Sequence, residues 1–178
     1  KNTVIKKFLS HLQELSEKKE DTYTEFWNQH GRILKEGYND YAHKDKLVPL
    51  LRFNSSACEN EDELISLDTY IERMNDKQEE IIFYSGASRE ALNSNPTLEI
   101  FRANDIEVLY CYDPIDEFVL PGLMEYKGKK IISADQVDSE KLLKMTEAEK
   151  EEEKTEEDKK RDKAVEKLTR RIKNILGD

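Results

Sequence analysis

Three carboxylates, Asp113, Asp116 and Glu117, lie close enough in the sequence to form a catalytic or metal-binding group. They follow an apolar segment, where a strand of a parallel sheet would end and a helix would begin, and ligand sites open at such positions. There the acids could act as a general acid and base or could bind magnesium. Acidic residues in the first turn of a helix also stabilise the helix dipole without any catalysis. Both interpretations stay open, although no phosphate-binding loop accompanies the acids.

The segment Ser85-Gly86-Ala87-Ser88 could offer backbone amides to an anion at the start of a helix. It has only one glycine, however, and dinucleotide-binding turns need several for the close approach of a pyrophosphate. We therefore predict a structural turn, with no nucleotide-binding residue. No serine of the sequence lies in the pattern of a hydrolase nucleophile, so no catalytic residue of that kind is predicted.

Histidines and cysteines are few and dispersed. The three histidines, His11, His30 and His43, lack the spacing of a helical metal-binding pair, and we predict surface or packing roles for them. Cys58 and Cys111 form neither a zinc-type cluster nor a disulfide framework, which favours a reducing compartment and ordinary packing. No metal site is predicted from these residues.

Composition excludes several classes of function. The 178 residues carry 29 Lys and Arg against 39 Asp and Glu, a formal net charge of -10. Because affinity for nucleic acid depends largely on Lys and Arg contacts with phosphates, we expect no nucleic-acid partner. No apolar run is long enough to span a bilayer and no signal-peptide pattern is present, so we expect no membrane partner and a cytoplasmic location.

The first part of the sequence has helical periodicity. Apolar residues at steps of three and four predict a helix over Thr3–Leu15 and another from Tyr23 to Leu34, which Gly37 and Asn39 would end. Trp27 shares the stripe of the second helix and is predicted to be a core anchor. A short helix over residues 44–52, an exposed loop over 54–63 and a helix capped by Ser66 complete the helical part, residues 1–76.

An α/β pattern follows over residues 77–143. Apolar, β-branched runs predict strands at 81–85, 106–112 and 128–133. Helices are predicted after Ser88, from Pro96 to Asn104 and over 114–126. This alternation favours a three-layer α/β/α unit with a mostly parallel sheet. A charged linker is predicted for residues 144–163 and an amphipathic helix for residues 164–178.

The predicted helix after Pro114 contains Pro121 and Gly122, which interrupt a regular helix. Most apolar residues of this helix should be core, but the interruption could tilt it and expose an apolar edge beside the acids. Such an edge is a candidate for protein contact.

Six segments resemble the middle region of the ninety-kilodalton heat-shock protein chaperone family, in particular its bacterial forms. They span most of residues 1–135, and the SLDTYIERM and DPIDE blocks are specific enough to make an accidental similarity improbable. The segment LTRRIKNILGD (168–178) resembles the entry to the family's C-terminal dimerisation domain. The six segments are EFWNQHGRILKEG (25–37), LVPLLRFNSS (47–56), LISLDTYIERM (64–74), IIFYSGAS (81–88), IEVLYCYDPIDEF (106–118) and YKGKKIIS (126–133).

The resemblance implies a part of an ATP-dependent chaperone of protein folding and the stress response. ATP and magnesium would bind an N-terminal domain of the parent protein, and a catalytic loop arginine would lie upstream of the segment that begins at Lys1. This chain would then have no catalytic or nucleotide-binding residue of its own, and the parent would be a homodimer. Its partners would be unfolded or partly folded client proteins, with Glu117, Phe118 and Pro121 on the client-facing helix.

Two alternatives remain from the residues themselves. The first is a small nucleotide-binding α/β enzyme that uses Asp113, Asp116 and Glu117. The second is a structural adaptor that pairs with another copy through the helix that starts at Ala164.

Overall fold

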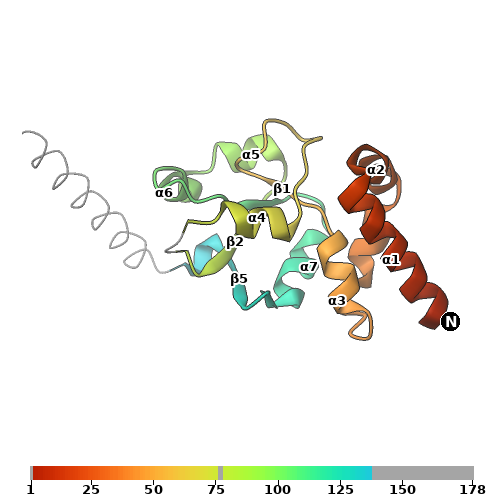
Figure 1. The fold of residues 1–178 in the computed structure, drawn as a ribbon. Coiled ribbons are helices and arrows are strands. Elements are labelled where there is room, and N and C mark those ends of the chain that lie inside the picture. The colour runs from red at the N-terminus through yellow and green to blue at the C-terminus, as the bar shows by residue number, and fades with distance from the viewer. Residues whose placement is uncertain (1, 76–77, 138–178) are drawn as a thin grey trace, which may run out of the picture. The chain divides into compact units, whose positions relative to one another are not determined.

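The computed structural model describes residues 2–75 and 78–137, and the predicted charged linker and amphipathic helix lie outside these ranges (Figure 1). The chain starts with a helical hairpin of α1 (Asn2–Lys18) and α2 (Glu20–Glu36). Both predicted helices are confirmed, and only Lys19 separates them. Phe8 and Phe26 meet edge to face across the hairpin, with 6.4 Å between ring centroids.

Short helical turns lead from the hairpin to the sheet. They are η1 (Gly37–Asn39), α3 (Lys44–Leu47) and η2 (Val48–Leu50), which confirms the short helix predicted in this region. The Tyr23 hydroxyl donates a 2.5 Å hydrogen bond to the Leu50 carbonyl and so ties α2 to this segment.

The sheet has five strands in the order β1-β3-β2-β5-β4. Its central strands are parallel, with β2 between β3 and β5, whereas β1 and β4 are antiparallel edge strands. The predicted mostly parallel sheet is therefore a mixed sheet. The strands are β1 (Asn54–Ser55), β2 (Glu80–Ser85), β3 (Leu109–Cys111), β4 (Glu125–Tyr126) and β5 (Lys129–Ser133).

The prediction of an exposed loop over residues 54–63 is wrong for the first residues of this range. Asn54, Ser55 and Cys58 are buried, and the first two form β1. Polar residues can be buried here because their hydrogen bonds are satisfied. The side-chain amide of Asn54 donates hydrogen bonds to the carbonyls of Asn60 and Glu63 at 2.8 and 2.7 Å.

Helical segments connect the strands, and their predicted caps are confirmed. The Ser66 and Ser88 hydroxyls accept hydrogen bonds from the amides of Thr69 and Ala91 at 3.0 and 3.2 Å. The segments are α4 (Leu67–Arg73), α5 (Arg89–Asn93), η3 (Pro96–Leu98), α6 (Glu99–Arg102), α7 (Asp116–Leu123) and η4 (Ala134–Gln136). None of the helices in the described ranges is long and apolar enough to cross a lipid bilayer.

The helix predicted over residues 114–126 is shorter at both ends. It starts at Asp116 and ends at Leu123, because Met124 has a positive φ of 62° and turns the chain into β4. Residues Glu125 and Tyr126 then pair with β5 instead of continuing the helix. Hydrophobic periodicity did not reveal this turn because Met124 and Tyr126 also fit an apolar helical pattern.

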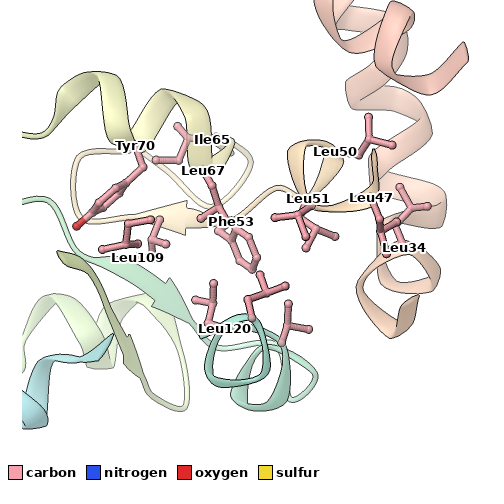
Figure 2. Packing of buried hydrophobic residues seen from close by; sticks show 14 of the residues in the cluster. Leu34, Leu47, Leu50, Leu51, Phe53, Ile65, Leu67, Tyr70, Leu109 and Leu120 are labelled. Atoms are coloured by element: carbon pink, nitrogen blue, oxygen red, sulfur yellow. The ribbon is translucent and has the colours of Figure 1, made fainter. Parts of the chain in front are cut away.

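One hydrophobic cluster joins the helical part to the sheet. It includes residues from Leu9 of α1 to Ile131 of β5. Figure 2 shows Phe53 between Leu67 and Leu120, and Leu51 on the side that faces Leu34 and Leu47. Residues 1–136 form one compact unit, and the division at residue 76 into a helical part and an α/β unit stays a prediction.

Tyr70 connects α4 to β2 and to the segments that precede β2 and β3. Its hydroxyl donates to the Glu107 carbonyl at 2.6 Å and accepts from the Ile82 amide at 3.0 Å and from Gln78. We expect Tyr70→Phe to lower the free energy of unfolding by about 1 to 3 kcal/mol, because the Ile82 N–H stays buried without a partner. Urea unfolding followed by circular dichroism measures this loss. Tyr84→Phe is the control, and an equal loss in that variant would contradict the explanation.

Candidate functional site

The site predicted from the acids and the apolar edge is centred on α7, which lies between β5 and α3 (Figure 1). A tight turn after β3 sets the start of this helix. The Asp113 carboxylate accepts a hydrogen bond from the Ile115 amide at 3.3 Å, and the Asp113 carbonyl accepts one from the Asp116 amide at 2.9 Å. Asp113 thus acts as a cap of the turn that begins α7.

One side of α7 is anchored in the core and the other side is open. Asp116, Val119, Leu120 and Leu123 are buried. On the opposite side Glu117 and Pro121 are exposed, and Phe118 is 59% exposed to solvent. The predicted client-contact residues therefore lie together on the exposed side of a helix whose other side is fixed.

The C-terminal half of α7 rests on the turn after α2. Gly122 lies so close to Tyr38 that a Cβ atom at this position would be 2.6 Å from the tyrosine ring. The Lys44 ammonium donates to the Leu123 carbonyl at 3.1 Å, at the helix end where a positive charge is favourable. These contacts hold α7 even though Pro121 cannot donate a backbone hydrogen bond within the helix.

A buried ion pair holds the N-terminal half of α7. The Lys35 ammonium of α2 is 2.6 Å from the Asp116 carboxylate, and only 7% and 3% of these residues are exposed. The ammonium also lies 5.9 and 5.2 Å from the ring centroids of Trp27 and Phe53. Burial raises the pKa of Asp116 to about 6, whereas the charge of Lys35 acts in the opposite direction.

A cleft of about 260 Å³ opens beside this ion pair. Its walls include Trp27, Arg52 and Tyr112 together with Asp113 and Asp116. The Arg52 guanidinium is held by the carbonyls of Pro49 and Leu51 and lies 4.7 Å from the Tyr23 ring centroid. The charged groups described in this cleft thus have partners within the protein. Its acids, Asp113 and Asp116, stabilise the fold through a turn and an ion pair.

The three acids do not converge on one point. Asp113 caps a turn, Asp116 is paired with Lys35, and Glu117 faces solvent on α7. Across residues 2–75 and 78–137, no group of three or more His, Cys, Asp or Glu side chains is arranged to hold a metal ion. The described geometry gives the acids separate structural and surface roles.

The turn at residues 85–88 has the predicted structural role. The Gly86 amide donates to the Cys111 carbonyl at 3.0 Å and extends the pairing of β2 with β3. A Cβ atom on Gly86 would be 2.7 Å from the Leu92 side chain, so the glycine permits close packing of α5. Ser88 caps that helix.

The histidines and cysteines have the predicted surface and packing roles. His11 and His30 are exposed, while His43 is buried with its Nδ1 atom 2.7 Å from the Asp40 carboxylate. This contact lowers the pKa of Asp40. Both cysteines are free and buried, and burial raises the pKa of Cys111, which keeps its thiol neutral. Trp27, with 7% exposure, is a core residue as predicted.

Two important basic residues were not identified from the sequence. Lys35 occupies a buried position of the α2 stripe, and this position was the available signal. Arg89 at the start of α5 is buried and donates to Asn54, Ser55 and Cys58. The partners of both residues are distant in the sequence, so no local pattern reveals them.

Comparisons with known proteins agree with this architecture. A sequence model of the family described as "Hsp90 protein" matches residues 1–178. The chain is 40% identical over its full length to the chaperone protein HtpG of Oleidesulfovibrio alaskensis and covers 28% of that protein. It is 43% identical to the HtpG of Geobacter sulfurreducens, with 97% of this chain and 27% of the relative aligned. The chain therefore spans about a quarter of the length of these relatives.

A solved structure gives the same result at the level of the fold. The middle domain of a putative heat shock protein from Plasmodium falciparum superposes with a TM-score of 0.71 and 31% sequence identity. The superposition covers 76% of this chain and 57% of that one. Sequence and fold together show that this chain belongs to the Hsp90 protein family and corresponds to its middle-domain region.

Proposed function

We propose that this chain is the client-contacting portion of an ATP-dependent chaperone. Glu117, Phe118 and Pro121 of α7 would contact unfolded or partly folded proteins. The observation that supports this proposal most is the exposure of Phe118, which is 59% accessible to solvent although three apolar residues of the same helix are buried. A large exposed aromatic group on a well-anchored helix is a feature of contact surfaces.

The arrangement suits weak binding to many sequences. Phe118 lies on a convex helix surface beside Glu117 and Pro121, so it can contact an apolar side chain without enclosing it. Burial of part of one aromatic group contributes only on the order of 1 kcal/mol. Several such contacts along an unfolded chain would give useful affinity, while each single contact would release easily.

The remaining parts of the proposal concern the whole protein. ATP and magnesium would bind outside this chain, and the chain would not hydrolyse ATP by itself. It would connect an ATPase domain to a dimerisation domain in a homodimeric, cytoplasmic chaperone. The 40% identity with a protein named chaperone protein HtpG supports this assignment.

Phe118→Asp is expected to weaken binding of an unfolded protein by about tenfold or more, because it replaces an apolar contact by a charge. Binding of labelled, reduced and carboxymethylated lactalbumin, which stays unfolded, can be followed by fluorescence anisotropy. Since Phe118 is exposed, the melting temperature should hardly change.

Val4→Asp is the matched control, because Val4 is 71% exposed on α1, away from α7. This variant should bind the unfolded protein as the parent chain does. Equal binding by the parent chain and by Phe118→Asp would contradict the proposed function. A large loss of stability in Phe118→Asp would show that its side chain is needed by the core.

A further inference from the structure

The exposed apolar surface does not end at Pro121. Met124, at the end of α7, is 70% exposed. Between these two residues Gly122 has no side chain, and the half-buried Tyr38 ring packs against it. Apolar groups therefore follow one another along α7 from Phe118 to Met124.

Tyr41 is a further exposed aromatic residue, on the loop between η1 and α3. The two segments that flank this loop contact the C-terminal end of α7: Tyr38 of η1 packs on Gly122, and Lys44 of α3 donates a hydrogen bond to the Leu123 carbonyl. Tyr41 is 81% exposed, more than any other large hydrophobic residue in the described ranges.

Internal bonds fix the loop that carries Tyr41. The Asp40 amide donates to the Gly37 carbonyl at 2.8 Å, and the Asp40 carboxylate is 2.7 Å from the ring of the buried His43. The Asp40 carboxylate also accepts a hydrogen bond from the Ala42 amide at 3.1 Å. The tyrosine ring is thus presented to solvent by an ordered backbone, which reduces the entropy lost when a partner binds.

The charges beside this surface favour a basic partner. Glu117 and Glu125 are exposed near its two ends, and within the described residues neither has an ion-pair partner. The nearby Lys127 is already paired with Asp68 at 2.7 Å. Glu125 lies opposite the exposed Lys130 in the pairing of β4 with β5, so the acid that remains uncompensated beside this surface is Glu117, next to Phe118. Its negative charge would attract Lys or Arg of a partner.

We propose that Tyr38, Tyr41, Phe118, Pro121 and Met124 form one apolar strip that binds extended polypeptide segments with large apolar side chains next to Lys or Arg. The inference rests on the proposed function and names the chemistry of the client segment. Phe118 and Leu123, the last residue of α7, are about 7.5 Å apart along the helix axis, from a rise of about 1.5 Å per residue, and Met124 follows Leu123 directly. An extended segment presents side chains on one face about every 7 Å, so alternate residues can reach successive parts of the strip.

Two labelled peptides test this proposal with the full 178-residue chain. Both peptides carry the same Phe and Leu residues at alternate positions, separated by Lys in one and by Glu in the other. We expect the Lys peptide to bind at least about tenfold more tightly in fluorescence anisotropy at low salt, and added salt to reduce the difference. Tyr41→Ser and Met124→Asn should each weaken binding of the Lys peptide by about three- to tenfold.

Val4→Asn is the control for these variants, since it removes an equally exposed apolar group from α1. Unchanged melting temperatures show that the variants are folded. If Phe118→Asp weakens binding but Tyr41→Ser and Met124→Asn do not, the strip is refuted while the proposed function stands. If none of the three weakens binding, both proposals fail. Equal binding of the Glu peptide refutes the basic partner, and sedimentation that shows only self-association through Tyr41 and Met124 refutes the polypeptide client.

Discussion

Replacement of Lys35 by methionine is expected to lower the free energy of unfolding by about 3 to 5 kcal/mol at neutral pH. Lys35 and Asp116 are both buried and are 2.6 Å apart. Methionine fills a similar volume between Trp27 and Phe53, so the main effect of the change is an unpaired, buried carboxylate. Urea unfolding measures the loss.

The loss should depend on pH. Burial raises the pKa of Asp116 to about 6 in the folded protein, above its ordinary value of 3.8, and removal of Lys35 would raise this pKa further. A carboxyl group with a raised pKa binds its proton more tightly in the folded state, so its contribution to stability falls as pH rises from about 4 through the folded pKa. The difference between Lys35→Met and the parent chain should therefore be smaller at pH 5 than at pH 8.

Two further variants test the explanation. Adding Asp116→Asn to Lys35→Met should recover part of the stability and remove its extra dependence on pH, because no charge remains to be buried. Lys18→Met is the matched control, since Lys18 pairs with Glu14 on the exposed surface of α1 and should matter little. A Lys35→Met variant with the same loss at pH 5 and pH 8 would contradict the role assigned to Asp116.

Arg89→Leu should produce a loss of similar size, about 3 to 5 kcal/mol. The guanidinium is buried and donates to the Asn54 side chain and to the carbonyls of Ser55 and Cys58. It also lies 5.7 Å from the Tyr110 ring centroid. Leucine would leave several buried acceptors without a donor and would free the segment that carries β1 from α5.

Unfolding gives the size of this loss of stability, and hydrogen exchange can show where in the chain it occurs. In Arg89→Leu, amides of residues 54–58 should exchange faster than in the parent chain, even under conditions where β2 stays protected. Arg102→Leu is the control, because Arg102 is exposed and donates one hydrogen bond, to the Leu92 carbonyl at 3.1 Å. Equal losses in the two variants would show that the Arg89 network has no special role.

Features encoded by neighbouring residues could be predicted from the sequence. Ser66 and Ser88 cap helices because a hydroxyl reaches an amide three residues ahead, whatever the rest of the fold does. The β-branched run at 81–85 likewise predicts a buried strand, and β2 extends from Glu80 to Ser85.

Features that depend on distant partners could not be predicted. Asn54 and Ser55 form a strand only because β3 offers them an edge, and their burial depends on acceptors and donors elsewhere, including Arg89. Lysine is ordinarily a surface residue, and Lys35 is buried where Asp116 faces it. Propensity and periodicity do not contain this information.

The candidate site was predicted in part. The sequence indicated that the interrupted helix around Pro121 could expose an apolar edge, and the structure exposes Phe118 and Met124 there. It did not indicate that the two segments flanking the loop of Tyr41 contact this helix, because the contacts of Tyr38 and Lys44 with α7 join residues that are distant in the sequence.

Amide chemical-shift mapping of the chain during titration with unfolded lactalbumin tests the central claim most directly. We predict that the largest shifts or broadening occur at Glu117–Glu125 of α7 and β4 and in the loop that carries Tyr41. The amides of α1 around Val4 and those lining the cleft at Trp27 should change little. Perturbations confined to that cleft or to α1, with α7 unchanged, would contradict the account.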